Sequence, residues 1–138
     1  MCGIVGCIGL KDPRKYIIEG LKTLDYRGYD SAGLAFLNDD IDIYREVGTV
    51  DKLDSIVPTL KYGKLAIGHT RWATHGKPNI RNSHPHLSFS KEFAIVHNGV
   101  IENFIELKKT LIDKGYEFRS DTDTEVIVNL IEDYYREP

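Results

Sequence analysis

The sequence lacks any run of about 20 apolar residues, the length that a helix needs to cross a bilayer. It also lacks a basic surplus, because 18 Lys and Arg stand against 21 Asp and Glu and the formal net charge is -3. Its basic residues are scattered singly instead of forming the stripes that bind phosphates. We therefore expect neither a membrane nor a nucleic acid as a partner.

Cysteine is also scarce, with Cys2 and Cys7 as the two thiols. A bridge between them would close too small a loop to stabilise much, and positions of opposite parity on a strand face opposite ways. The N-terminus has no basic stretch before an apolar run, as a secretory signal would. These features favour free thiols in a reducing compartment, and we expect the cytoplasm.

What is present is the composition of a globular protein, with 41% hydrophobic and 28% charged residues in a chain of 138. This length suffices for one domain or part of one. Strand periodicity appears in six segments, and a hairpin signal at 38–40 joins the strands predicted at 32–37 and 41–47. The predicted strands are 3–9, 32–37, 41–47, 65–70, 93–97 and 116–119.

Helix-start signals alternate with these strands. Asp12 before Pro13 reads as an N-cap with proline at the first helical position, followed by a periodic apolar face. A weaker helical turn spans 50–57 and is stopped by Pro58.

The C-terminal half contains two further helix starts. Asn103 with Glu106 resembles a capping box for a helix that Gly115 ends, and Thr122 with Glu125 repeats the pattern. The element order predicts a mixed α/β or α+β chain whose sheet packs under helices. The chain stops just after a helix with no return strand, so we expect part of a larger domain to be absent.

Among the residues of this chain, Cys2 suggests the most specific chemistry. Removal of Met1 would place its thiol and a free α-amine on one residue, and an amine titrating near pH 7.7 to 8.0 can accept the thiol proton. A thiolate is the attacking form. The alternative is a small residue that merely enters a strand.

Attack on an amide also requires donors for the oxyanion, and Asn98-Gly99 could supply a side-chain amide and a backbone N–H. The same dipeptide is also the commonest hairpin turn. For a small amino-acid substrate, Arg71 at a strand end could bind a carboxylate, and Asp123 in the first turn of a helix could face a cation. Asp123 could equally complement the helix dipole.

Six ordered motifs carry a resemblance that covers the chain from end to end. They are CGIVG at 2–6, YRGYDSAG at 26–33, HTRWATHG at 69–76, HPH at 84–86, HNGVIEN at 97–103 and SDTDTEV at 120–126. Together they resemble the class II glutamine amidotransferases, which are N-terminal-nucleophile hydrolases, and within them the glucosamine-6-phosphate synthases. Phosphoribosyl-pyrophosphate amidotransferases carry an aromatic-serine-threonine run where Trp72-Ala73-Thr74 stands.

The resemblance implies a mechanism and a fold. Cys2 would attack the glutamine side-chain amide, release ammonia and form a γ-glutamyl thioester, with its own α-amine as base and with Asn98 and Gly99 as the oxyanion hole. Arg71 would hold the α-carboxylate of glutamine and Asp123 its α-ammonium, with the Gly99 carbonyl nearby. The implied fold is an α+β, four-layer αββα sandwich whose C-terminal part is missing from these 138 residues. No cofactor is implied.

Other residues receive supporting roles from the same resemblance. Thr74 and His75 would line the pocket, and residues 72–79 would form a loop that closes over glutamine. Arg27 would orient the terminal residue. Trp72 is assigned to the pocket, although it could be a core aromatic.

Some patterns favour an ordinary structural explanation. His84 and His86 have a spacing that could ligate a metal, but no Asp, Glu or Cys completes a site, so we expect no metal. The glycine spacing at 3, 6 and 9 is not the dinucleotide fingerprint, and close packing of a strand explains it. Cys7 is predicted to be an inert core residue.

Three hypotheses follow for residues 1–138, which we interpret as one truncated glutaminase domain without sugar-isomerase domains. In the first, the domain supplies ammonia for the amination of fructose 6-phosphate, a substrate reached only through the absent domains of a homodimeric full-length enzyme. In the second, it serves another acceptor such as phosphoribosyl pyrophosphate. In the third, it is a remnant that binds glutamine without turnover.

Overall fold

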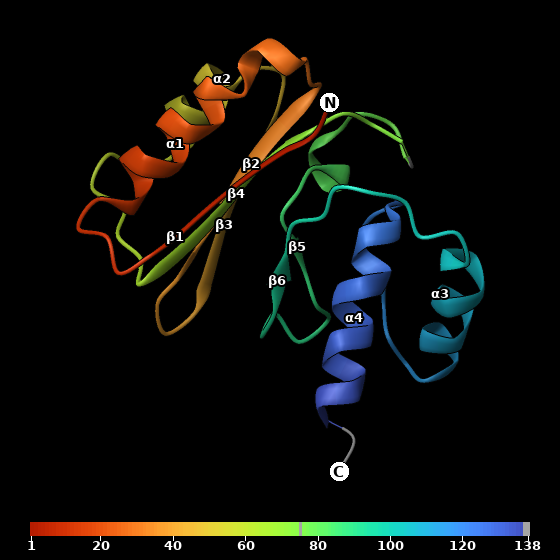
Figure 1. Cartoon of the computed structure of the whole chain (residues 1–138). Coiled ribbons are helices and arrows are strands. Elements are labelled where there is room, and N and C mark those ends of the chain that lie inside the picture. Colours follow the sequence, from red (N-terminus) through yellow and green to blue (C-terminus); the bar gives the residue numbers. More distant parts are fainter. Residues whose placement is uncertain (75, 137–138) are drawn as a thin grey trace.

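The computed structural model describes residues 1–74 and 76–136, which form two sheets between two layers of helices (Figure 1). The larger sheet is antiparallel, with the strand order β1-β4-β2-β3. Its strands are β1 (Gly3–Ile8), β2 (Ser31–Leu37), β3 (Ile41–Val47) and β4 (Leu65–Arg71). The smaller sheet pairs β5 (His86–Leu87) with β6 (Ala94–Ile95).

One face of the larger sheet is covered by α1 (Pro13–Thr23) and α2 (Val50–Ile56), which contact its strands. On the far side, α4 (Asp123–Arg136) packs on the smaller sheet and α3 (Phe104–Asp113) packs on α4. Short 3-10 turns occupy Asp25–Arg27 and Ile80–Asn82. The predicted α+β, αββα layering is therefore confirmed. Within the described ranges, no helix is long and apolar enough to cross a membrane.

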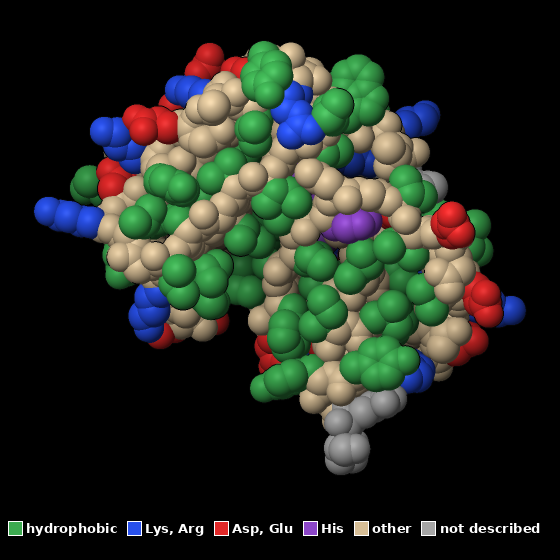
Figure 2. Space-filling model, viewed as in Figure 1, with side chains coloured by type: hydrophobic (Ala, Val, Ile, Leu, Met, Phe, Trp, Pro, Cys, Tyr) green, Lys and Arg blue, Asp and Glu red, His purple; other side chains and the backbone are tan. Residues whose placement is uncertain are grey.

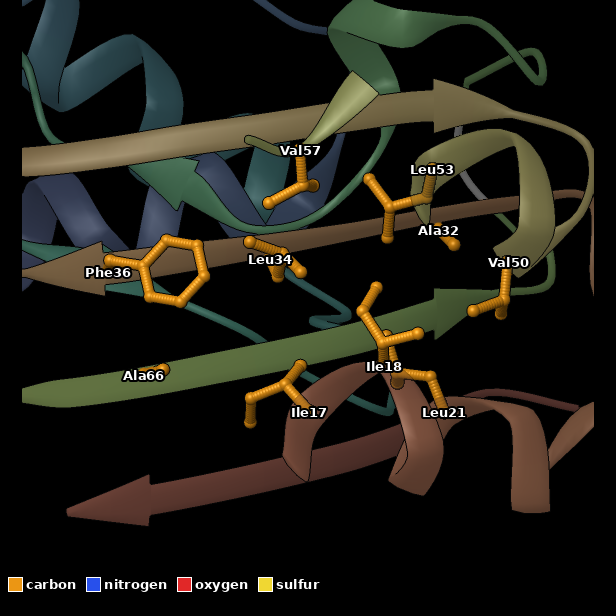
Figure 3. Packing of buried hydrophobic residues seen from close by; sticks show 10 residues of the cluster. All are labelled: Ile17, Ile18, Leu21, Ala32, Leu34, Phe36, Val50, Leu53, Val57 and Ala66. Carbon is orange, nitrogen blue, oxygen red and sulfur yellow. The ribbon is translucent and has the colours of Figure 1, made fainter. Parts of the chain in front are cut away.

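The hydrophobic core lies between α1, α2 and the larger sheet (Figure 3). Alternate residues of a strand point to opposite faces, so one set on β2 packs against the helices while the other faces the second sheet. Burial of each large core side chain contributes about 1.5–3 kcal/mol. The core residues are Ile17, Ile18, Leu21, Ala32, Leu34, Phe36, Val50, Leu53, Val57 and Ala66.

At their ends the two sheets diverge around an apolar groove, visible as a recess in Figure 2. Its walls come from the C-terminal end of β2, the N-terminal end of β4 and the start of β6, and include Leu37, Leu65, Ile67 and Phe93. At the other end, His69 of β4 stacks on His84, two residues before β5, so the two sheets approach closely there.

Gly33 of β2 marks that close approach. A Cβ atom at this position would lie 1.8 Å from the His84 carbonyl oxygen. Gly33→Ala should therefore force the sheets apart and lower the free energy of unfolding by about 3 kcal/mol, measured by urea denaturation. Gly6→Ala is the matched control, because its Cβ would meet the nearest atom at 3.8 Å and should change stability by less than about 1 kcal/mol. Equal effects of the two substitutions would contradict this packing.

Helix starts were predicted well, but two capping details were wrong. The Asp12 side chain accepts from the Lys15 N–H at 3.0 Å, as an N-cap does. Asn103 precedes α3 without making a side-chain cap bond. Glu125 makes no capping box with Thr122, because its carboxylate accepts instead from the backbone N–H groups of Arg119 and Ser120.

The strand predicted over 116–119 is also wrong. Tyr116 donates its N–H to the Leu111 carbonyl at 3.0 Å, and the Arg119 N–H is taken by Glu125. These groups are therefore unavailable for a ladder. Between Arg71 and Lys91, where no helix or strand was predicted, the structure has the short strand β5 and one 3-10 turn.

Candidate active site

A cavity opens where the N-terminus, the end of β4, the segment after β6 and the start of α4 meet. These segments are distant in sequence and converge at one end of the sandwich (Figure 1). The cavity is lined by Cys2, Arg71, Trp72, Thr74, His84, His97, Gly99, Val100, Thr122, Asp123 and Thr124. Of the residues predicted for the site, Cys2, Arg71, Trp72, Thr74, Gly99 and Asp123 thus face one space. His75 lies outside the described residues.

The thiol of Cys2 is held against the segment that follows β4. Its Sγ accepts from the Trp72 N–H at 3.2 Å and lies 3.7 Å from the Trp72 carbonyl oxygen. Cys7, within β1, is partly buried and packs against the hydrophobic core, and burial raises its pKa. The structure therefore separates a thiol that lines a cavity from one that packs against the core.

Asn98 and Gly99 lie beside Cys2 without forming a hairpin, since β6 ends at Ile95 and the next regular element is α3. The Asn98 side-chain Nδ2 donates to the Cys2 carbonyl oxygen at 3.2 Å. Gly99 adopts a φ of 151°, and a Cβ there would lie 2.8 Å from Nε2 of His97. The Asn98 amide is thus held against Cys2, and Gly99 shares the cavity with it, an arrangement that could supply the two donors of an oxyanion hole.

Arg71 and Asp123 bring opposite charges to the cavity. Arg71 is only 4% exposed and donates from Nη2 to the Gly76 carbonyl at 3.2 Å. Burial lowers its pKa, while the charges of Asp30, Cys2 and Asp123 oppose that shift, and a guanidinium remains charged at neutral pH. Asp123 is 3% exposed, and its Oδ2 accepts from the Ile101 N–H at 2.7 Å. A zwitterionic amino acid fits such a cation and anion.

Trp72 and Arg27 occupy the entrance and the N-terminal edge of this site. Trp72 is 56% exposed and lines the cavity, so it does not belong to the hydrophobic core. The Arg27 guanidinium contacts the Met1 sulfur, and the Met1 amine donates to the carbonyls of Arg27 at 3.1 Å and Gly28 at 2.5 Å. Arg27 thus lies against residue 1, whose presence makes the Cys2 nitrogen an amide.

The buried histidines at and behind the cavity were not assigned a role from sequence. His69 and His84 stack with ring centroids 4.0 Å apart, and His84 meets His86 edge-on at 4.7 Å. One ring nitrogen of each has a protein partner: His69 Nε2 lies 2.8 Å from Oδ1 of Asn98, His84 Nδ1 accepts from the His97 N–H at 3.3 Å, and His86 Nε2 lies 3.0 Å from the Thr122 hydroxyl. Among residues 1–74 and 76–136, no group of three or more His, Cys, Asp or Glu could hold a metal.

The sequence held usable signals for these missed residues. His69 lies two positions before Arg71 on β4 and so shares its face of the strand. His97 directly precedes Asn98 in sequence. In the structure, its Nδ1 lies 3.2 Å from the hydroxyl of Thr124, next to Asp123.

Acid should destabilise the fold through these histidines. Burial, together with nearby positive charge, lowers the pKa of His69 to about 4, that of His86 to about 3 and that of His84 further. Unfolded histidines titrate near 6.5, so the unfolded state binds more protons below that pH. Their stabilising contribution is complete above pH 6.5 and is lost as pH falls toward the lower folded values.

The free energy of unfolding should fall by at most about 4 kcal/mol between pH 7.5 and pH 5.5, because each of the three histidines contributes about 1.4 kcal/mol. Urea unfolding at the two pH values measures it, in a range above the ordinary titration of carboxylates. His86→Gln should reduce the pH dependence by about a third. A stability that does not change between these pH values would show that the rings are not buried as neutral groups.

A thiol and a cation–anion pair line one cavity at the edge of an αββα sandwich, and the Asn98 side-chain amide contacts Cys2 beside it. The fold is that of the N-terminal-nucleophile hydrolases. The sequence profile of the family described as "Glutamine amidotransferase domain" matches residues 56–137. The chain therefore belongs to the glutamine amidotransferase domain family, and it is an enzyme domain of that kind.

Relatives and solved structures agree with this assignment. The chain is 58% identical over 141 residues to a protein of Francisella tularensis named glutamine--fructose-6-phosphate aminotransferase [isomerizing], and 52% identical over 138 residues to one of that name from Pyrococcus horikoshii. Each alignment covers 99% of this chain and 23% of the relative. The chain thus spans about a quarter of the length of these relatives.

Similar solved structures include an allosteric regulatory enzyme of purine biosynthesis, with a TM-score of 0.81 and 30% identity. Another is a glutamine phosphoribosylpyrophosphate amidotransferase from B. subtilis, with a TM-score of 0.79 and 28% identity. Each match covers 96% of this chain and 29% of the solved chain. At these values the similarity extends over nearly the whole fold and includes both sheets.

Proposed function

We propose that the domain hydrolyses the side-chain amide of L-glutamine with Cys2 as nucleophile. The observation that carries the proposal is the single cavity shared by Cys2, Gly99, Arg71 and Asp123. A glutaminase needs a nucleophile, an oxyanion hole and a pair of charges that fixes the amino-acid end of its substrate. The residues around this cavity can supply each of these groups.

The first half of the reaction forms a thioester. The α-amine of Cys2, freed by removal of Met1, takes the thiol proton, and the thiolate attacks the amide carbon. The Asn98 Nδ2 hydrogens and the Gly99 N–H stabilise the negative charge on the amide oxygen. The ammonium then returns the proton to the leaving nitrogen as the C–N bond breaks, which releases ammonia and leaves a γ-glutamyl thioester on Sγ.

The second half is hydrolysis of this thioester. Water gives a proton to the same amine, attacks the carbonyl carbon in the same oxyanion hole and expels the Cys2 thiolate, which is reprotonated. Arg71 pairs with the α-carboxylate throughout and Asp123 with the α-ammonium, with the Gly99 carbonyl beside it. Trp72 and Thr74 line the pocket, and Arg27 orients the N-terminal residue.

We further propose that the released ammonia serves an acceptor bound by other domains of a longer, homodimeric protein. Relatives at 52–58% identity are named for fructose 6-phosphate, which favours that acceptor and glucosamine 6-phosphate as the product. The solved structure named for phosphoribosylpyrophosphate is only 28% identical, so that acceptor is the second candidate. Assays of the full-length protein with each phosphorylated acceptor distinguish them.

The glutaminase step is tested on the 138-residue chain after intact mass confirms the loss of Met1. Ammonia and glutamate should appear in equal amounts from glutamine, and asparagine should be a poor substrate because its amide is one methylene closer to the α-carbon. Calorimetric binding of glutamine without ammonia release would support a non-catalytic remnant and contradict this proposal.

A further inference from the structure

We propose that His69 is a positioning residue of this site, whose Nε2–H fixes the Asn98 side-chain amide with its NH₂ group toward the oxyanion. The inference rests on the proposed glutaminase function and adds a residue that does not line the cavity. His69 lies on β4, paired with Ile4 of β1 and Gly33 of β2, so its backbone is held on both sides.

The hydrogen-bond geometry determines which atoms face each other. His69 Nε2 lies 3.2 Å from the His97 carbonyl oxygen and 2.8 Å from Oδ1 of Asn98. A backbone carbonyl can only accept, so Nε2 must carry the hydrogen. The Asn98 atom facing that N–H must then be an acceptor, which assigns it as oxygen. The Asn98 NH₂ group is thereby directed to the opposite side, where it donates to the Cys2 carbonyl at 3.2 Å.

The surroundings of His69 preserve this arrangement. The ring is fully buried and stacks on His84 at an interplanar angle of 13°, which restricts rotation. The charged and titratable groups around it are Arg71, His84, His86 and His97, and burial keeps its pKa well below neutrality. A neutral, immobile ring therefore presents the same N–H to Asn98 at working pH.

Loss of that N–H should act on catalysis more than on substrate binding. Without it, the Asn98 amide can turn over and present its oxygen to the oxyanion, where two negative partial charges repel. One oxyanion donor contributes about 10²–10³ in kcat, which sets the upper limit. We expect kcat to fall by roughly 10- to 100-fold in His69→Leu, with KM changed less than about threefold, because the cation and anion that hold glutamine are untouched.

His69→Gln is the discriminating variant, since the glutamine side-chain N–H can occupy nearly the position of Nε2–H. It should recover kcat to within about fivefold of the parent protein. Asn129→Leu is the control for general damage: Asn129 is fully buried and bonds to Phe89 N–H and the Glu125 carbonyl, away from the cavity. It should lower the unfolding temperature and leave kcat unchanged. Equal losses in His69→Leu and His69→Gln, or no loss in His69→Leu, would overturn the proposal.

A second readout separates this inference from the proposed function. The Asn98 Nδ2 hydrogens should give two sharp, slowly exchanging NMR signals in the parent chain and in His69→Gln, and exchange-broadened signals in His69→Leu. This pattern would support positioning by His69 even if the parent chain released no ammonia, a result that would contradict the glutaminase proposal alone. Sharp signals retained in His69→Leu would overturn the inference whatever the activity.

Discussion

Cys2→Ala is expected to abolish ammonia release from glutamine, with kcat lowered by at least about 10³-fold. The substitution removes the only cavity-lining thiol among the described residues and leaves no group that can form a thioester. Binding should survive, because the charged residues that contact the amino-acid end remain. The assay is coupled detection of glutamate, with calorimetry on the same preparation to confirm that glutamine still binds.

Cys7→Ala is the matched control for that experiment. Cys7 lies five positions after Cys2, within β1, and its thiol packs against the hydrophobic core, so its loss should lower stability and leave turnover intact. If Cys2→Ala retained measurable glutaminase activity while Cys7→Ala lost it, the nucleophile would have been assigned to the wrong residue.

Asp123→Asn should weaken glutamine binding by about 100-fold, equivalent to about 3 kcal/mol. Asparagine is nearly isosteric, and its Oδ1 can still accept the Ile101 N–H that Asp123 accepts at 2.7 Å. The substitution therefore removes one buried negative charge and keeps the local fold. KM should rise for glutamine, while the rate of alkylation of Cys2 by iodoacetamide, which has no α-ammonium, should stay the same.

Asp121→Asn provides the comparison, two residues before Asp123. Asp121 is at the surface, where it pairs with Arg81, and it does not line the cavity. Its loss should change stability little and leave KM within about twofold. A similar KM increase in both variants would mean that overall charge, and not a contact at Asp123, governs affinity.

The fold could be read from sequence where local signals and tertiary packing agree. The Asp12–Pro13 start of α1 and the apolar run of β2 are examples, since a cap or an apolar run depends on neighbouring residues. The signal over 116–119 failed because a side chain from the next helix, Glu125, takes the backbone donor that a strand would use. Periodicity alone carries no information about such a long-range competitor.

The candidate site likewise combines residues that local sequence reveals with residues that only long-range packing reveals. Cys2, Arg71 and Asp123 were predicted because their side chains have chemistry that suits an amino-acid substrate. His69 was missed because its role depends on a neighbour 29 positions away, and a buried histidine usually has only a structural role. The stacking of His69 on His84 across two sheets is a property of their packing, which sequence spacing does not reveal.

The central claim is that Cys2 acts as an N-terminal nucleophile, and its most direct test is intact mass spectrometry of acid-quenched protein during turnover of glutamine. Protein that has lost Met1 should carry one γ-glutamyl unit, mapped to Cys2, and the adduct should disappear when glutamine is exhausted. Protein that retains Met1 should show no adduct and no ammonia release. A glutamyl adduct elsewhere, or equal turnover by protein with Met1 in place, would contradict the account.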